Sequence, residues 1–225
     1  MTRQVTLVAV TQPTISNELV KSMMSPEQFI AYCARVSNPT NQNNHQTSDK
    51  LLAYCIRNQH WSIFEMAHVV MEINTTRDIA RQILRHRSFS FQEFSQRYAD
   101  ASQLGFTIRE ARLQDAKNRQ NSIETDDTRL QIIWKQKQEQ LIHETQLAYK
   151  WALENGIAKE QARAILPEGL TTTRLYMSGT LRSWIHYCDV RCEEGTQKEH
   201  REVAFSAWNE IAKYFPSIVS AIVGE

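Results

Sequence analysis

A helical pattern that has to end abruptly is the strongest constraint in this sequence. From Thr76 onward, apolar side chains recur three and four residues apart, as on one face of an α-helix, at Ile79, Ala80, Ile83 and Leu84. If the helix continued, Arg87 would fall on this apolar face. We therefore predict a helix from Thr76 to about His86, followed by a change in chain direction. Binding sites are commonly built at such helix ends.

The side chains around this predicted turn are rich in arginine. From Arg77 to Arg97 the chain has five arginines, two acids and no lysine. Arginine makes paired hydrogen bonds to phosphate and carboxylate oxygens, so the segment indicates an anionic ligand. Gln82 and Arg85 are three residues apart on one helix face, and Ser95 and Arg97 are two apart. An Arg–Glu surface network that caps the helix end would produce the same spacing, and spacing alone does not separate the two interpretations.

The rest of the chain alternates short β-rich segments with longer helical patterns. Strands are predicted at residues 4–10, 67–74 and 106–113, and polar loops at 38–46 and 118–127. Helices are predicted at 26–36, from a cap at Ser48 onward, and at 127–155, 158–166, 175–190 and 196–215. The helices are longer and more numerous than the strands, which predicts an α+β protein. We expect one domain spanning residues 1–225.

Composition argues against several classes of protein. The net charge is only +1, whereas a general nucleic-acid binder is usually strongly basic. The apolar run at the N-terminus is too short for a signal peptide, and no stretch reaches the ~20 apolar residues that span a bilayer. We therefore expect a cytoplasmic protein with reduced cysteines and no membrane partner. Cys188 and Cys192, with His186 and His200, lack the compact spacing of a zinc site, so no metal is expected.

Two triplets at a fixed separation carry a resemblance to a known family. Arg85-His86-Arg87 is followed, after seven residues, by Ser95-Gln96-Arg97. This pattern resembles the signature of the flavin-dependent thymidylate synthases. Other segments similar to that family are Ala34–Ser37, His60–Glu65, Ala80–Gln82, Ala162–Pro167, Arg182–Trp184 and Arg191. The resemblance runs from about residue 30 to residue 205.

This resemblance implies a fold, an activity and an assembly. The implied fold is α+β, with a mixed or antiparallel sheet packed with several long helices. The implied reaction converts dUMP to dTMP, with 5,10-methylenetetrahydrofolate as carbon donor and NADPH-reduced FAD as hydride donor, and it releases tetrahydrofolate. The implied assembly is a homotetramer whose active sites are shared between subunits.

The resemblance also implies roles for individual residues. Arg191 is the expected catalytic residue, a fixed cation that stabilises negative charge on the uracil as N3 ionises. The residues expected to contact FAD are Ser37, Ser62, Glu65, Arg85, His86, Arg87, Arg182 and His186. The residues expected to hold dUMP are Gln82, Arg85, Glu93, Ser95, Gln96, Arg97, Arg163 and Arg191. Ser95 is expected to bind phosphate and not to act as a nucleophile, because no general base can be linked to it in the sequence.

Three positions depart from the family pattern. Ile63 stands where proline is usual, Met66 where histidine is usual, and Thr180 where asparagine is usual. These departures bear on the adenine and ribityl contacts of FAD. They leave the two triplets unchanged.

An alternative function is a non-enzymatic nucleotide- or RNA-binding module. In that case the arginine-rich turn would bind the backbone of a single strand, and bases would stack on Phe89, Phe91 and Phe94. The low net charge weakens this alternative. Bound flavin would distinguish the enzyme from the binding module.

Overall fold

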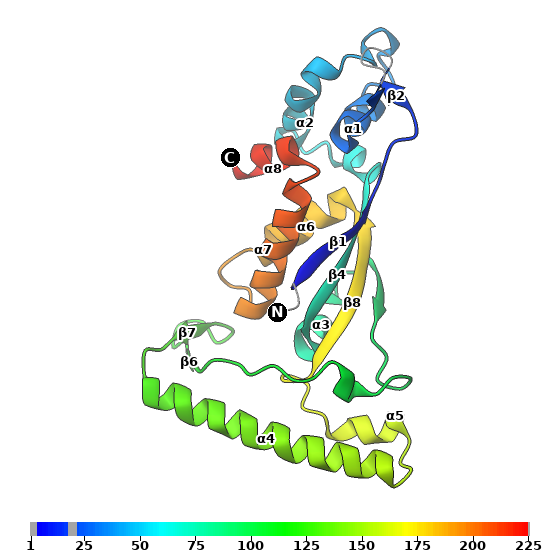
Figure 1. Cartoon of the computed structure of the whole chain (residues 1–225). Coiled ribbons are helices and arrows are strands. Elements are labelled where there is room, and N and C mark those ends of the chain that lie inside the picture. The colour runs from blue at the N-terminus through cyan, green and yellow to red at the C-terminus, as the bar shows by residue number, and fades with distance from the viewer. Residues whose placement is uncertain (1–3, 18–21, 225) are drawn as a thin grey trace.

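The centre of the fold is an antiparallel sheet of four strands (Figure 1). The computed structural model describes residues 4–17 and 22–224. The strands stand side by side in the order β1 (Val5–Val10), β4 (His68–Thr76), β8 (Thr172–Thr180) and β5 (Ser90–Glu93). The α+β class and the strands predicted near residues 4–10 and 67–74 are confirmed.

Strand β8 is the largest correction to the sequence prediction. Residues 175–180 were predicted to begin a helix, but they pair with β4 in a register that runs from Thr172 opposite Thr76 to Thr180 opposite His68. Every second side chain is buried, including those of Leu175 and Met177. A short apolar run of this kind suits a buried strand as well as a helix, and pairing with β4 decides between them.

Helices α6 (Leu181–Arg191) and α7 (Lys198–Ala212) pack against each other and against the sheet (Figure 1). Thr180 caps α6 by accepting a hydrogen bond from the backbone N–H of Ser183. The apolar side chains of Leu181, Ile185 and Cys188 on α6 are buried, and the Trp184 indole donates to the backbone oxygen of Val69 at 3.1 Å. This indole contact links α6 to the central strand β4.

Three shorter helices gather at one end of the sheet, namely α1 (Pro26–Ala34), α2 (Ser48–Arg57) and α8 (Pro216–Val223) (Figure 1). The predicted start of α1 is confirmed, because Ser25 and Gln28 form a reciprocal capping box. The predicted cap of α2 is wrong. Thr47 holds the N-cap position, whereas Ser48 is the buried first residue of the helix.

The long helix α4 (Thr128–Glu154) lies apart from the sheet (Figure 1) and confirms the prediction for residues 127–155. Asp127 caps its start, and Gly156 follows its end with a φ of 77°, a conformation that glycine adopts without strain. Helix α5 (Lys159–Ala162) is shorter than predicted, because residues 163–165 continue as a 3₁₀ turn. Trp151 and Leu147 of α4 are 60% and 52% exposed in the single chain.

The remaining strands form two small hairpins. β2 (Ser16–Asn17) pairs with β3 (Ser22–Met23), and β6 (Arg112–Gln114) pairs with β7 (Ser122–Glu124). The predicted strand at 106–113 is mostly wrong, since only its last two residues are in β6, and the predicted loop at 118–127 contains β7. Within the described ranges, no helix is long and apolar enough to cross a membrane. The same residues contain no group of three or more His, Cys, Asp or Glu side chains that could hold a metal ion.

Candidate functional site

The arginine-rich turn begins where helix α3 (Arg77–Ile83) ends. The backbone N–H of His86 donates to the oxygen of Ile83 at 3.0 Å, and that of Phe89 donates to His86 at 3.3 Å, so the chain turns before β5 begins. The Phe89 ring then packs so closely on Gly179 that a Cβ at that glycine would lie 2.4 Å from the ring. The predicted end of the helix before Arg87 is confirmed, and the Arg87 side chain is exposed.

The turn brings His86 to Arg191, which lies at the end of α6. The Nε–H of Arg191 donates to His86 Nε2 at 2.9 Å, so the His86 ring must carry its own proton on Nδ1. Burial, Arg191 and Arg85 lower the pKa of His86 to about 4. A neutral imidazole thus orients the guanidinium that the sequence resemblance assigned to catalysis.

Four of the eight residues expected to hold dUMP lie on β5 and the turn that follows it. The Glu93 carboxylate accepts from Arg77 at 3.1 Å and from Thr173 at 2.9 Å, so its position is set from two neighbouring elements. Ser95 is exposed and Gln96 is buried. The backbone N–H groups of Ala99 and Tyr98 donate to the backbone oxygen of Ser95 at 2.9 and 3.1 Å, and these bonds close a tight turn.

Glu160 of α5 links two arginines that are far apart in the sequence. Arg97 forms an ion pair with the Glu160 carboxylate at 3.4 Å, and Arg163 Nε donates to the Glu160 backbone oxygen at 3.3 Å. The structure thus brings together two residues that were both assigned to dUMP. The side chains of Arg97 and Glu160 are 68% and 50% exposed. An ion pair this exposed is weak, so a phosphate can compete with the carboxylate for Arg97.

The residues expected to contact FAD fall into three groups, which are the Arg85–Arg87 turn, a cluster on α6, and Ser37. Arg182 pairs with Glu65, and the His186 ring meets Trp61 edge-on at 4.8 Å, so α6 and the 3₁₀ turn at Trp61–Glu65 form one cluster that includes Ser62. Burial and then Arg182 lower the pKa of His186, while Asp189 partly opposes this shift.

Ser37 lies elsewhere in the single chain. It lines a cavity of about 500 Å³ between the end of α1 and helix α2, together with Arg35, Lys50 and Tyr54. Helix α1, whose end lines this cavity, also contacts the Trp61–Glu65 turn of the Arg182 cluster.

Gln82 faces α7, whereas Arg85 is exposed beyond the end of α3. The Gln82 amide donates to Gln197 Oε1 at 2.8 Å, and its oxygen lies 3.3 Å from His200 Nδ1. Sequence reasoning missed Gln197 as a site residue and considered His200 only as a weak metal ligand. The spacing of these two polar residues at the start of α7 was the available signal.

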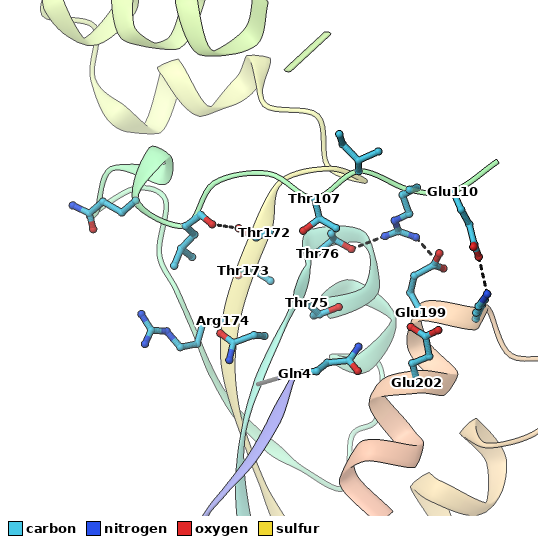
Figure 2. A pocket seen from close by; sticks show the side chains of 16 residues that line it. Gln4, Thr75, Thr76, Thr107, Glu110, Thr172, Thr173, Arg174, Glu199 and Glu202 are labelled. Atoms are coloured by element: carbon cyan, nitrogen blue, oxygen red, sulfur yellow. Dashed lines mark hydrogen bonds and ion pairs between the residues drawn. The ribbon is translucent and has the colours of Figure 1, made fainter. Parts of the chain in front are cut away.

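A cavity of about 770 Å³ lies beside the ends of β4 and β8 (Figure 2). Figure 2 shows Thr75 and Thr76 of β4, Thr172, Thr173 and Arg174 of β8, and Glu199 and Glu202 of α7 around it. None of the 16 side chains drawn there is a predicted site residue. The cavity nonetheless borders the site, because Thr173 binds Glu93 and Glu199 binds Gln197, the partner of Gln82.

Comparison with solved structures identifies the fold. A UMP/dUMP methylase from Streptomyces cacaoi, bound with 5-Br dUMP, superposes with a TM-score of 0.80 at 24% sequence identity, over 98% of this chain and 94% of that one. The sheet and helices described above therefore have the same overall arrangement as those of that methylase.

Comparison of sequences identifies the family. Residues 18–217 match the family described as thymidylate synthase complementing protein. A flavin-dependent thymidylate synthase from Synechocystis sp. is 54% identical over 88% of this chain and 90% of its own length. A probable flavin-dependent thymidylate synthase from Paramecium bursaria Chlorella virus 1 is 50% identical over 96% and 97%. The chain belongs to the flavin-dependent thymidylate synthase family, as its two triplets indicated.

Proposed function

We propose that this protein makes dTMP by reductive methylation of dUMP. The balanced reaction converts dUMP, 5,10-methylenetetrahydrofolate, NADPH and a proton into dTMP, tetrahydrofolate and NADP⁺. The observation that carries the proposal is the folded Arg85–Arg97 segment, whose His86 meets Arg191 at 2.9 Å, in a chain with two relatives at 50% identity or more.

FAD fits the donor chemistry of the residues assigned to it. The exposed guanidinium groups of Arg85 and Arg87 suit its phosphates, while His86 and His186, both with a lowered pKa, stay neutral near pH 7. Ser37, Ser62, Glu65 and Arg182 complete the assigned set. When bound, FAD reduced by NADPH supplies the hydride.

The nucleotide is held by residues of three elements. Arg97, Arg163 and Ser95 bind the phosphate, which replaces Glu160 as the partner of the two arginines. Glu93, already fixed by Arg77 and Thr173, accepts from a sugar hydroxyl. Gln82, Arg85, Gln96 and Arg191 complete the assigned set.

Arg191 performs the electrostatic step at the pyrimidine. Carbon 5 of uracil is a weak nucleophile until electron density moves into the ring. A guanidinium keeps its charge near neutral pH, and His86 holds it in one orientation, so it stabilises the developing anion without reorganising. Such preorganised groups contribute several kcal/mol.

A homotetramer with shared active sites completes the proposal, with residues 1–225 acting as one domain in the cytoplasm. The support is α4, which exposes apolar side chains in the single chain, including Trp134, Leu141, Leu147 and Trp151. Active sites shared between subunits would also account for groups of assigned residues that lie apart in the single chain.

Tritium release from 5-tritiated dUMP tests the reaction directly. With FAD, NADPH and 5,10-methylenetetrahydrofolate the protein is expected to release tritium and form dTMP, and omission of FAD is expected to abolish both. The matched variant is Arg191→Lys, which keeps the charge but loses the planar guanidinium that can make two parallel hydrogen bonds. It is expected to bind FAD and to release tritium more slowly. A protein that neither takes up FAD nor releases tritium would favour the alternative nucleotide- or RNA-binding module.

A further inference from the structure

A chain of hydrogen bonds runs from Glu199 through Gln82 to Tyr187. Gln197 Nε2 donates to Glu199 Oε2 at 2.9 Å, and Gln82 Nε2 donates to Gln197 Oε1 at 2.8 Å. His200 Nδ1 lies 3.3 Å from Gln82 Oε1, and His200 Nε2 lies 3.1 Å from the Tyr187 hydroxyl. We call these five residues the Gln82 relay.

The Glu199 carboxylate sets the direction of every bond in the Gln82 relay. An ionised carboxylate only accepts, so Gln197 turns its NH₂ group toward Glu199 and its oxygen toward Gln82. The Gln82 amide must then donate to Gln197, which leaves its oxygen facing His200. Since that oxygen can only accept, His200 carries its proton on Nδ1, and Nε2 accepts from Tyr187.

The surroundings keep Glu199 ionised and His200 neutral. Burial alone would raise the pKa of Glu199, but its own backbone N–H, Arg109, Gln197 and Arg112 hold that pKa below its ordinary value. Arg109 and Arg112 contact its two oxygens at 3.0 and 2.5 Å. His200 is fully buried, and this burial, Arg191 and His86 lower its pKa to about 3.

Helix α3 is tied to the same carboxylate at a second point. Asp78, one helical turn before Gln82, binds Arg109 at 2.8 Å, and Arg109 binds Glu199. Two side chains on one face of α3 therefore converge on Glu199 of α7. This double tie sets both the position of α3 and the orientation of the Gln82 amide.

We propose that His200 and Gln197 are positioning residues that hold the Gln82 amide in a single orientation for the bound nucleotide. Each amide nitrogen has two protons and each amide oxygen two lone pairs, so Gln82 keeps one N–H and one lone pair for dUMP. A flipped amide would put an NH₂ group against the His200 Nδ1 proton and lose both relay bonds. The inference rests on the proposed assignment of Gln82 to dUMP.

Steady-state kinetics of the FAD-loaded enzyme test the proposal. His200→Leu removes the donor to Gln82. We expect the KM for dUMP to rise about tenfold, because one hydrogen bond to a buried partner is lost. The kcat and the absorbance of bound FAD should change much less. His200→Asn restores an N–H donor near the position of Nδ1 and should recover most of the KM. Val203→Ala, which also truncates a fully buried side chain of α7, is the control and should leave the KM unchanged.

Two kinetic outcomes would overturn the proposal. One is a KM in His200→Asn as high as in His200→Leu, and the other is an equal rise in Val203→Ala. The ¹⁵N shifts of selectively labelled histidine give a readout that needs no turnover: the neutral Nδ1–H tautomer is expected for His200, and the Nε2–H tautomer would contradict the relay. If the Nδ1–H tautomer is found and the enzyme releases no tritium from dUMP, the proposed function fails while the relay stands.

Discussion

The acid stability of the protein should depend on His200. Its pKa is about 3 in the folded chain, because burial and the charge of Arg191 disfavour the imidazolium, and close to 6.5 when unfolded. Between these values the unfolded state binds more protons, so stability is complete above the unfolded pKa and falls as the pH is lowered. Each pH unit below about 6.5 lowers the free energy of unfolding by about 1.4 kcal/mol. At about pH 5 the total loss is therefore roughly 2 kcal/mol.

Urea denaturation of the flavin-free protein at one fixed protein concentration measures this effect. The free energy of unfolding is compared at about pH 7.5 and about pH 5 for the wild type and for His200→Asn, which has no imidazole at this position. We expect the variant to be less stable at the higher pH, because it loses the bond to Tyr187, but to lose roughly 2 kcal/mol less on acidification. Equal acid losses in the two proteins would refute the assignment of a neutral, buried His200.

Three other substitutions follow from the geometry of the site. Arg191→Lys keeps the charge but not the fork that reaches both His86 and the nucleotide, so kcat for tritium release should fall about 100-fold with FAD still bound. Ser95→Ala should keep measurable turnover and raise the KM for dUMP about tenfold, because it removes a phosphate contact; complete loss of activity with binding intact and a covalent uracil adduct in the wild type would contradict this. Gly179→Ala should destabilise the protein by about 1–3 kcal/mol in thermal unfolding, because the added Cβ would overlap the Phe89 ring. An unchanged Tm would show that the Phe89 ring can move aside without cost.

Local patterns were sufficient for the parts of the fold that depend on neighbours in the sequence. The capping box at Ser25, the long helix beginning after Asp127 and the end of α3 before Arg87 all involve residues within a few positions of each other. The strand β8 could not be assigned in this way. An apolar run at 175–180 satisfies a strand or a helix, and only its pairing with β4, about a hundred residues earlier, favours the strand.

The same distinction between local sequence patterns and distant contacts applies to the candidate site. Two triplets with fixed spacing, Arg85–Arg87 and Ser95–Arg97, were enough to indicate the family, because the side chains assigned to phosphate and flavin lie close together in the sequence. Their orientation depends on distant segments: Arg191 meets His86 across 105 positions, and Gln82 meets His200 across 118. Contacts of that span follow from how α6 and α7 pack on the sheet, which no local pattern specifies. The residue types come from the sequence, whereas the proton positions and the direction of the Gln82 amide come from the packing.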